Sequence, residues 1–196
     1  MIATLSKYIP LNSVYLIDEI LENHPIEIKI VPNRTTKHGD FKKMKNGKTQ
    51  ITINNSLNQY HFLLTLVHEI AHFITFKQST HVKPHGLEWK RNFQHLMLPF
   101  LQPSIFPDSL LQHLANYFKN PKASTGSDVQ LTYALKMYDK NSAMSFVIDL
   151  QPGSLFSFKN KTYQKGPIRR TRFECIELHS KKKYLFNQNA EVHLIK

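Results

Sequence analysis

The chain of 196 residues is long enough for one domain of ordinary size, or for one domain with a small appendage. With 41% hydrophobic and 20% charged residues it can bury a core, which excludes a wholly disordered protein. Lysine and arginine outnumber aspartate and glutamate by 12, and such a surplus attracts polyanions, most commonly nucleic acid.

Three features bear on the cellular compartment. Polar residues interrupt every apolar run well before the roughly 18 residues that a membrane span needs, so we expect no membrane partner. The first residues lack the charged and then apolar pattern of a secretory signal. The single cysteine, Cys175, cannot form an intramolecular disulfide. We therefore expect a cytoplasmic protein.

The first elements in chain order are a mixture of helix and strand. Residues 11–22 have the apolar spacing of a helix, and isoleucines alternate with other residues over 26–30, as in a strand. Residues 39–45 and 49–53 are predicted to form a β-hairpin across Asn46-Gly47, the commonest type I′ turn signal.

Helices follow the hairpin. Ser56 and Gln59, three residues apart, have the spacing of a capping box and predict the start of a helix that continues to about residue 76. Apolar residues at helical spacing predict a second helix from about residue 87 to 100. A third helix is expected over about residues 107–119.

The C-terminal part differs in composition and pattern. Residues 121–128 include Pro, Ser, Gly and Asp, a composition typical of a linker. Beyond them, alternating segments separated by turns predict a small antiparallel sheet or barrel over 129–196. Residues 153–196 hold ten Lys or Arg and three Glu, so this part carries more than half of the positive surplus.

The helix after Ser56 contains the motif His68-Glu69-Ile70-Ala71-His72. Residues four apart project from one face of an α-helix, so both imidazoles can reach one metal ion at about 2.0–2.1 Å. Glu69 lies about 100° round the helix from His68, near enough to orient a water without binding the metal. The motif predicts one catalytic zinc per chain, with Glu69 as the catalytic residue.

A catalytic zinc needs a third protein ligand and an open position for water. The candidates downstream are His81, in an apparent loop, His85, directly before Gly86 and the next helix, and Glu88, in the first turn of that helix. The next helix could hold His85 rigidly at the site, which favours His85. Glu88 would suit a His-His-Glu zinc site, but a carboxylate in the first turn of a helix is also favoured simply as a cap.

Together these motifs resemble the SprT-like and Spartan zinc metalloproteases. Those proteins pair HExxH with a downstream His-Gly-x-x-Trp/Phe box, which matches His85-Gly86-Leu87-Glu88-Trp89, and the resemblance covers about residues 10–118. It implies that His68, His72 and His85 hold the zinc and that Glu69 is catalytic. It also implies proteolysis of proteins crosslinked to, or trapped on, DNA.

The chain departs from that family in its C-terminal part. Bacterial members often end in a four-cysteine zinc ribbon, whereas here only Cys175 is present. Hydrophobic packing must therefore hold any β-rich module. Basic residues interleave with aromatic ones there, which suits phosphate contacts and base stacking, although a merely solvated surface is an open alternative. The candidate nucleic-acid-binding residues are Arg169, Arg170, Arg172, Lys181, Lys182 and Lys183.

The sequence therefore predicts an α+β protein in two parts. A zincin-like metalloprotease domain over residues 1–120, with helices and a small antiparallel sheet, is followed by a linker at 121–128 and a small basic β-rich domain over 129–196. We expect a zinc-dependent endopeptidase that acts on DNA-associated proteins, with single-stranded or damaged DNA as a partner. A non-catalytic, zinc-stabilised nucleic-acid-binding module and a peptidase with no DNA role are the alternatives.

Overall fold

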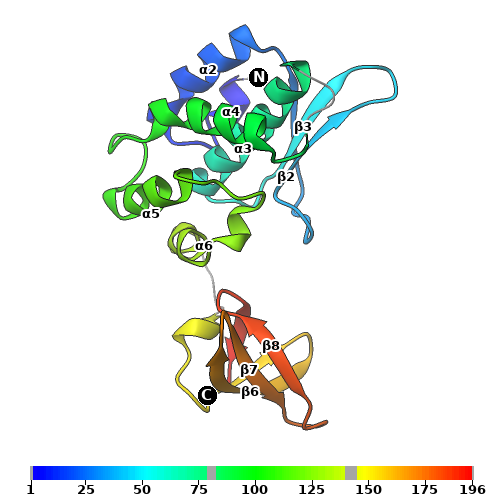
Figure 1. Cartoon of the computed structure of the whole chain (residues 1–196), viewed down its shortest axis with the longest axis vertical. Coiled ribbons are helices and arrows are strands. Elements are labelled where there is room, and N and C mark those ends of the chain that lie inside the picture. Colours follow the sequence, from blue (N-terminus) through cyan, green and yellow to red (C-terminus); the bar gives the residue numbers. More distant parts are fainter. Residues whose placement is uncertain (1, 79–82, 140–144, 196) are drawn as a thin grey trace. The chain divides into compact units, whose positions relative to one another are not determined.

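The structure is a computed structural model that describes residues 2–78, 83–139 and 145–195 (Figure 1). The chain divides into two compact units, Met1–Asp139 and Lys140–Lys196. Among the described residues, no helix combines the length and the apolar character needed to span a membrane.

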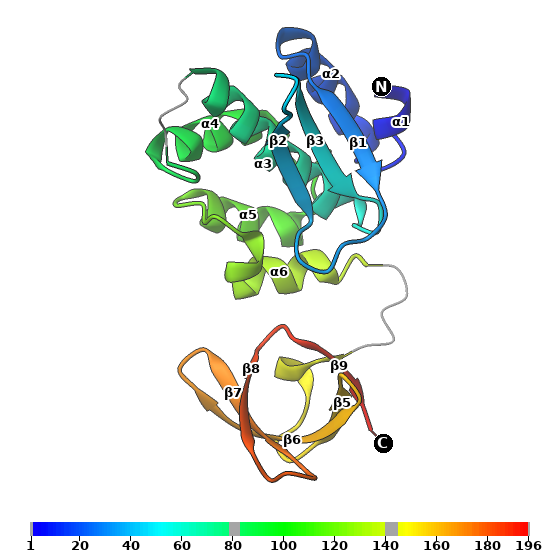
Figure 2. The ribbon, with the colours of Figure 1, turned by 90° about the vertical axis from the view of Figure 1, so that its right-hand side faces the viewer.

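The first unit packs helices against one face of a small sheet. Strand β3 (Thr49–Asn54) lies in the middle, parallel to β1 (Glu27–Val31) and antiparallel to β2 (Gly39–Lys43). The sheet is therefore mixed rather than purely antiparallel, and β2 is an edge strand that packs on α3 (Figure 2). The helices of this unit are α1 (Ile2–Leu5), α2 (Val14–Asn23), α3 (Gln59–Gln78), α4 (Leu87–Met97), α5 (Asp108–Phe118) and α6 (Val129–Lys136).

The β2–β3 hairpin is present, but the expected type I′ turn is wrong. A type I′ turn requires positive φ at both central residues. Here Gly47 has φ 81°, whereas Asn46 is not among the residues with positive φ. The Gly47 amide donates to the carbonyl of Met44 at 3.0 Å, so the turn spans residues 44–47 and Gly47 takes the left-handed position at its end.

Helix α3 begins later than the capping box predicts. Asn58, not Ser56, caps the helix, because its Oδ1 accepts hydrogen bonds from the amides of Tyr60 at 3.1 Å and His61 at 3.0 Å. Asn58 Nδ2 also donates to the carbonyl of Leu135 at 2.8 Å. The start of α3 is thus attached to α6 as well as capped.

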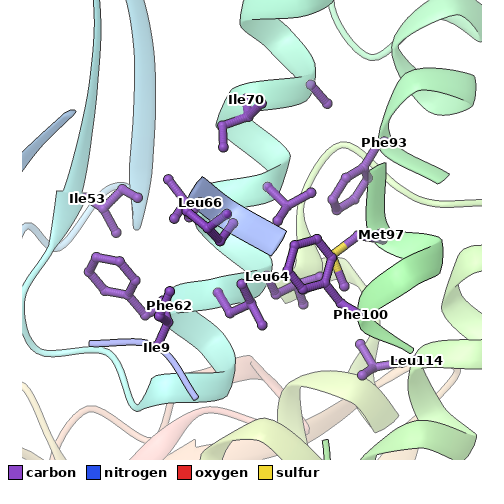
Figure 3. Packing of buried hydrophobic residues seen from close by; sticks show 14 of the residues in the cluster. Ile9, Ile53, Phe62, Leu64, Leu66, Ile70, Phe93, Met97, Phe100 and Leu114 are labelled. Carbon is purple, nitrogen blue, oxygen red and sulfur yellow. The ribbon is translucent and has the colours of Figure 1, made fainter. Parts of the chain in front are cut away.

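Helix α3 is the central element of the first unit. It is apolar on almost every side, as expected for a helix surrounded by protein. Figure 3 shows its side chains between Ile53 of β3 on one side and residues of α4 and α5 on the other. The fully buried residues of α3 include Phe62, Leu63, Leu64, Leu66, Val67, Ile70 and Ala71. A helix held in this way gives the side chains of the HExxH motif fixed positions.

The boundary between the two units differs from the expected linker. It falls between Asp139 and Lys140, and residues 129–136 are helical rather than β-like. Asp128 caps α6 by accepting from the Leu131 amide at 3.1 Å. Leu131 and Leu135, four residues apart, are fully buried in the core of the first unit. Burial of this helical face explains why the segment belongs to the first unit.

The second unit is built of strands, as the alternation predicts. They are β4 (Ser145–Phe146), β5 (Leu155–Phe158), β6 (Lys161–Arg169), β7 (Arg172–Glu177), β8 (Lys183–Asn187) and β9 (Glu191–Leu194). Their order is β4-β9-β5-β6-β7-β8, and Figure 2 shows them curling around a common interior. The buried apolar residues there are Val147, Leu150, Phe156, Tyr163, Cys175, Phe186 and Val192.

A lysine lies inside this second core. Lys165 is only 5% exposed, and its Nζ donates hydrogen bonds to the carbonyls of Ile148 and Leu150. The same ammonium lies 4.1 Å from the centre of the Phe173 ring. The buried charge is therefore satisfied by two acceptors and an aromatic face.

Candidate metal centre

Helix α3 supplies two of the three predicted ligands. His68 and His72 are one turn apart, with ring centroids 5.0 Å from each other. The neighbouring Ile70 and Ala71 are fully buried. Residues four apart lie on one face of a helix, so both imidazoles project toward one side of α3. Because α3 is packed on nearly all sides, it is a rigid base for them.

The turn before α4 supplies the third histidine. The amide of Gly86 donates to the carbonyl of Lys83 at 2.9 Å, and His85 adopts a left-handed φ of 59°. A Cβ atom on Gly86 would lie 2.9 Å from the same Lys83 carbonyl oxygen, so a larger residue would disturb the turn. This tight geometry directs His85 toward α3.

The three histidines converge. His72 Nε2 lies 2.9 Å from His85 Nε2, and His85 Nε2 lies 3.3 Å from His68 Nε2. Nitrogens bound tetrahedrally to one zinc at about 2.0–2.1 Å would be about 3.3–3.4 Å apart. Over the described parts of the chain, this is the one group of three or more potential ligands that meets in this way. The donor set and its spacing fit a metal ion.

The electrostatics of the histidines also suit a metal. Burial lowers the pKa of His68 to about 3 and that of His72 to about 4, with smaller contributions from neighbouring histidines. Burial lowers the pKa of His85 as well. All three rings are therefore neutral near pH 7, and neutral imidazole is the form that binds a metal.

The other two candidates for the third ligand are placed differently. Glu88 is exposed in the first turn of α4 and is outside the converging group. A carboxylate there is favoured by the helix dipole. His81 lies outside the described residues.

Glu69 lies beside the histidines, against the edge strand β2. Its side chain is 7% exposed, and the backbone amide of Phe41 donates a hydrogen bond to its carboxylate. Burial, and then the charge of Asp40, raise the pKa of Glu69 to about 8, although the Phe41 amide, Arg34 and Lys37 oppose the rise. A carboxyl group with such a pKa can both accept and donate a proton near neutral pH.

Asn54 organises the loop that leads into β2. This fully buried side chain donates from Nδ2 to the carbonyl of Lys37 at 2.8 Å, and its Oδ1 accepts from Arg34 Nε at 2.8 Å. The backbone amide of Asn54 donates to the carbonyl of His38 at 2.9 Å. The loop is thereby fixed as one wall of the site.

The site opens into a cleft with a volume of about 600 Å³. The floor contains Thr65, His68, Glu69 and His72 of α3, and the walls contain residues 35–41, Pro84, His85, Ala123 and Ser124. The last two belong to the segment that the sequence predicts to be a linker. Tyr117 secures it through its hydroxyl, which donates to the carbonyl of Lys122 at 2.9 Å. No motif in the sequence marks this wall.

The six candidate nucleic-acid-binding residues are all exposed but do not form one cluster. Arg169, Arg170 and Arg172 flank the β6–β7 turn, whereas the three lysines lie at the other end of β7. Between them Glu174 pairs with Arg169 Nη1 at 3.2 Å and with Lys183 Nζ at 2.9 Å. Two of the six charges are therefore partly compensated.

Comparison with known families agrees with the geometry of the site. The model of the SprT-like family matches residues 11–104, which include α2, β1–β3, α3 and α4. Both the HExxH motif and the His85–Trp89 box lie within the match. Searches among curated proteins and among solved structures found no significant match.

Proposed function

We propose that this chain, whose residues 11–104 belong to the SprT-like family of metallopeptidases, is a zinc-dependent endopeptidase that acts on proteins associated with DNA. One observation carries the proposal. Three neutral histidines converge in a cleft directly beside Glu69, a buried carboxyl group whose pKa is raised. A purely structural metal site would not need that carboxyl group.

The residues have separate roles in this proposal. His68, His72 and His85 would hold the zinc, which when bound supplies Lewis acidity that polarises the scissile carbonyl and acidifies water. Glu69 accepts a proton as the water oxygen attacks the carbonyl carbon. It then gives that proton to the amide nitrogen, so that the carbon–nitrogen bond breaks and a carboxylic acid and an amine result.

The edge strand provides a way to hold an extended substrate. β2 lies at the open side of its sheet, and Gly39, Asp40 and Phe41 line the cleft. A peptide that adds as a further strand would place its backbone along the catalytic groups. Lys42, Lys43, Lys45 and Lys48 are exposed on the same hairpin, and Lys42 pairs with Asp40 at 3.2 Å.

The DNA part of the proposal is supported by charge. The surplus of 12 positive charges favours a polyanionic partner, and the exposed Arg170, Arg172, Lys181 and Lys182 are suited to phosphate contacts. Single-stranded DNA would also allow bases to stack on aromatic residues. In this proposal the second unit contacts DNA through these surface cations.

Metal content and proteolysis, measured together, test the proposed function. Purified protein should contain about one zinc per chain, the number that one three-ligand catalytic set binds. It should cleave an unfolded protein substrate, lose activity in a chelator and regain it with zinc. Single-stranded DNA should stimulate cleavage of a DNA-bound substrate. Zinc without cleavage would indicate a binding module, and cleavage indifferent to DNA would indicate a general peptidase.

A further inference from the structure

The three histidine rings share one neighbour, the indole of Trp89. Its ring centroid lies 4.7 Å from that of His68, 5.2 Å from that of His72 and 4.6 Å from that of His85. The indole stacks on His72, with 28° between the planes, and meets the other two rings edge to face. Trp89 thus forms a common wall behind the whole ligand set.

This wall is itself immobilised. Trp89 is 1% exposed, and the ring of Phe93, one turn further along α4, lies 5.0 Å away. The centroid of the Phe93 ring in turn lies 5.3 Å from that of His68 and 4.9 Å from that of Phe118 in α5. The indole is therefore held between the histidines and a row of aromatic rings, and it cannot move without opening the core.

A rigid wall matters because the ligands come from two separate elements. His68 and His72 lie on α3, whereas His85 lies on a turn in which its φ is positive. Each ring can rotate about its side-chain bonds unless packing prevents it. Contact with one flat surface restricts all three rotations at once, so less ordering remains to be done when a metal binds.

We infer that Trp89 is a positioning residue that holds His68, His72 and His85 in ligand geometry before the metal arrives. The inference rests on the proposed zinc site but adds a role for a residue that touches neither the metal nor the substrate. Within the His85-Gly86-x-x-Trp89 box, His85 is then a ligand, Gly86 permits the turn and Trp89 forms the wall.

The chain offers an internal reporter, because Trp89 is its single tryptophan. Tryptophan emission from the protein therefore comes only from this wall. Titration of metal-free protein with zinc should change that emission and reach saturation at about one equivalent, as expected for one three-ligand set. The His85→Ala variant should not show the saturable change. The change is expected because a divalent charge then lies on the rings that contact the indole. Emission that stays constant while zinc binds would mean that Trp89 does not contact the occupied ligand set, and would overturn the inference.

Substitution gives a second test. We expect Trp89→Leu to weaken zinc binding by about 10- to 100-fold, the usual loss when a partner that orients metal ligands is removed. Trp89→Phe, which retains an aromatic face, should lose less. Zinc affinity is measured by competition with a chromogenic chelator, and circular dichroism and thermal melting in excess EDTA report the fold separately.

Phe106→Leu is the matched control. Phe106 is fully buried in the same core but contacts Tyr60 rather than the histidines. It should lower the melting temperature and leave zinc affinity unchanged. Normal zinc affinity in Trp89→Leu, or an equal loss in both leucine variants, would overturn the role of Trp89 alone. Failure of the wild-type protein to bind zinc would overturn the proposed metal site and this inference together.

Discussion

Gly39 approaches Glu69 so closely that a Cβ atom on Gly39 would lie 2.7 Å from Glu69 Oε1. The same atom would lie 2.7 Å from Thr65 Cγ2, so neither neighbour leaves room for it. Only glycine lets the edge strand lie directly against the carboxyl group, where the Phe41 amide donates to it. The position of the proposed base is thus set by the backbone of β2.

Gly39→Ala should lower turnover without removing the metal. The added methyl group must displace either Glu69 or β2, and a shift of about 1 Å in a catalytic group can reduce the rate about 10²-fold. Zinc content should stay at the wild-type value. Gly47→Asn, at the open tip of the same hairpin, is the control and should leave both properties unchanged. Full activity in Gly39→Ala would contradict the proposed placement of Glu69.

Glu69→Gln should separate catalysis from metal binding. The amide keeps the size of the side chain but cannot accept the proton of the attacking water. Turnover should fall by about 10²-fold or more, while zinc content and the melting temperature stay near those of the wild type. A variant that cleaves as well as its parent would exclude the proposed mechanism.

His85→Ala should lose zinc, and Glu88→Ala should retain it. The Nε2 atoms of His85 and His72 are 2.9 Å apart, whereas Glu88 is exposed and outside the ligand group. Metal analysis after dialysis against a weak chelator gives the answer. The reverse pattern would show that the third ligand is a carboxylate.

His61 should make the metal-free protein sensitive to acid. Burial, followed by the charges of His38 and Lys136, lowers its pKa from 6.5 to about 3. Below pH 6.5 the unfolded chain therefore binds a proton that the folded chain does not. The free energy of unfolding should fall by about 1.4 kcal/mol per pH unit on this account. In EDTA, urea unfolding of His61→Leu should show a shallower decrease between pH 6.5 and 5, with parallel curves above pH 7. Equal slopes in this range would contradict the lowered pKa.

The second unit should contribute to DNA binding through charge. A protein ending at Asp139 keeps α6 and the first core intact, so it should retain zinc. It should bind single-stranded DNA more weakly, with a shallower salt dependence, since each phosphate contact contributes about −0.7 to the slope of log K against log salt. Fluorescence anisotropy at several salt concentrations measures both quantities.

Two double variants of equal charge change locate the contact. Arg170→Ala with Arg172→Ala, and Lys181→Ala with Lys182→Ala, remove two cations from opposite ends of β7. Loss in only one of them would identify the end that meets DNA. Equal binding by the truncated and full-length proteins would instead point to the exposed lysines of the β2–β3 hairpin.

The sequence predicted best what depends on local spacing. The helix of His68 and His72, the helix after Gly86 and the β2–β3 hairpin follow from periodicity and motif, and the structure confirms them. The convergence of His85 with the other two histidines also agrees with the spacing. The roles of these histidines as zinc ligands, and of Glu69 as the base, stay predictions.

What the sequence missed depends on tertiary contacts. Asn58 rather than Ser56 caps α3 because Asn58 also contacts α6, and α6 itself is held by the burial of Leu131 and Leu135. The wall at Ala123 and Ser124 depends on the hydrogen bond from the Tyr117 hydroxyl to the Lys122 carbonyl. A short polar segment that is fixed by distant neighbours has the composition of a linker, so pattern alone cannot distinguish the two.

The buried Lys165 links two segments of the core of the second unit. Small domains often need a staple, because their cores bury little apolar surface. Here an ammonium group gathers the carbonyls of Ile148 and Leu150 from one segment and the ring of Phe173 from another. Because this cation belongs to the chain, chelators cannot remove it. Acetylation of Lys165 would remove the positive charge and would leave at least one of the two carbonyls without its hydrogen-bond donor.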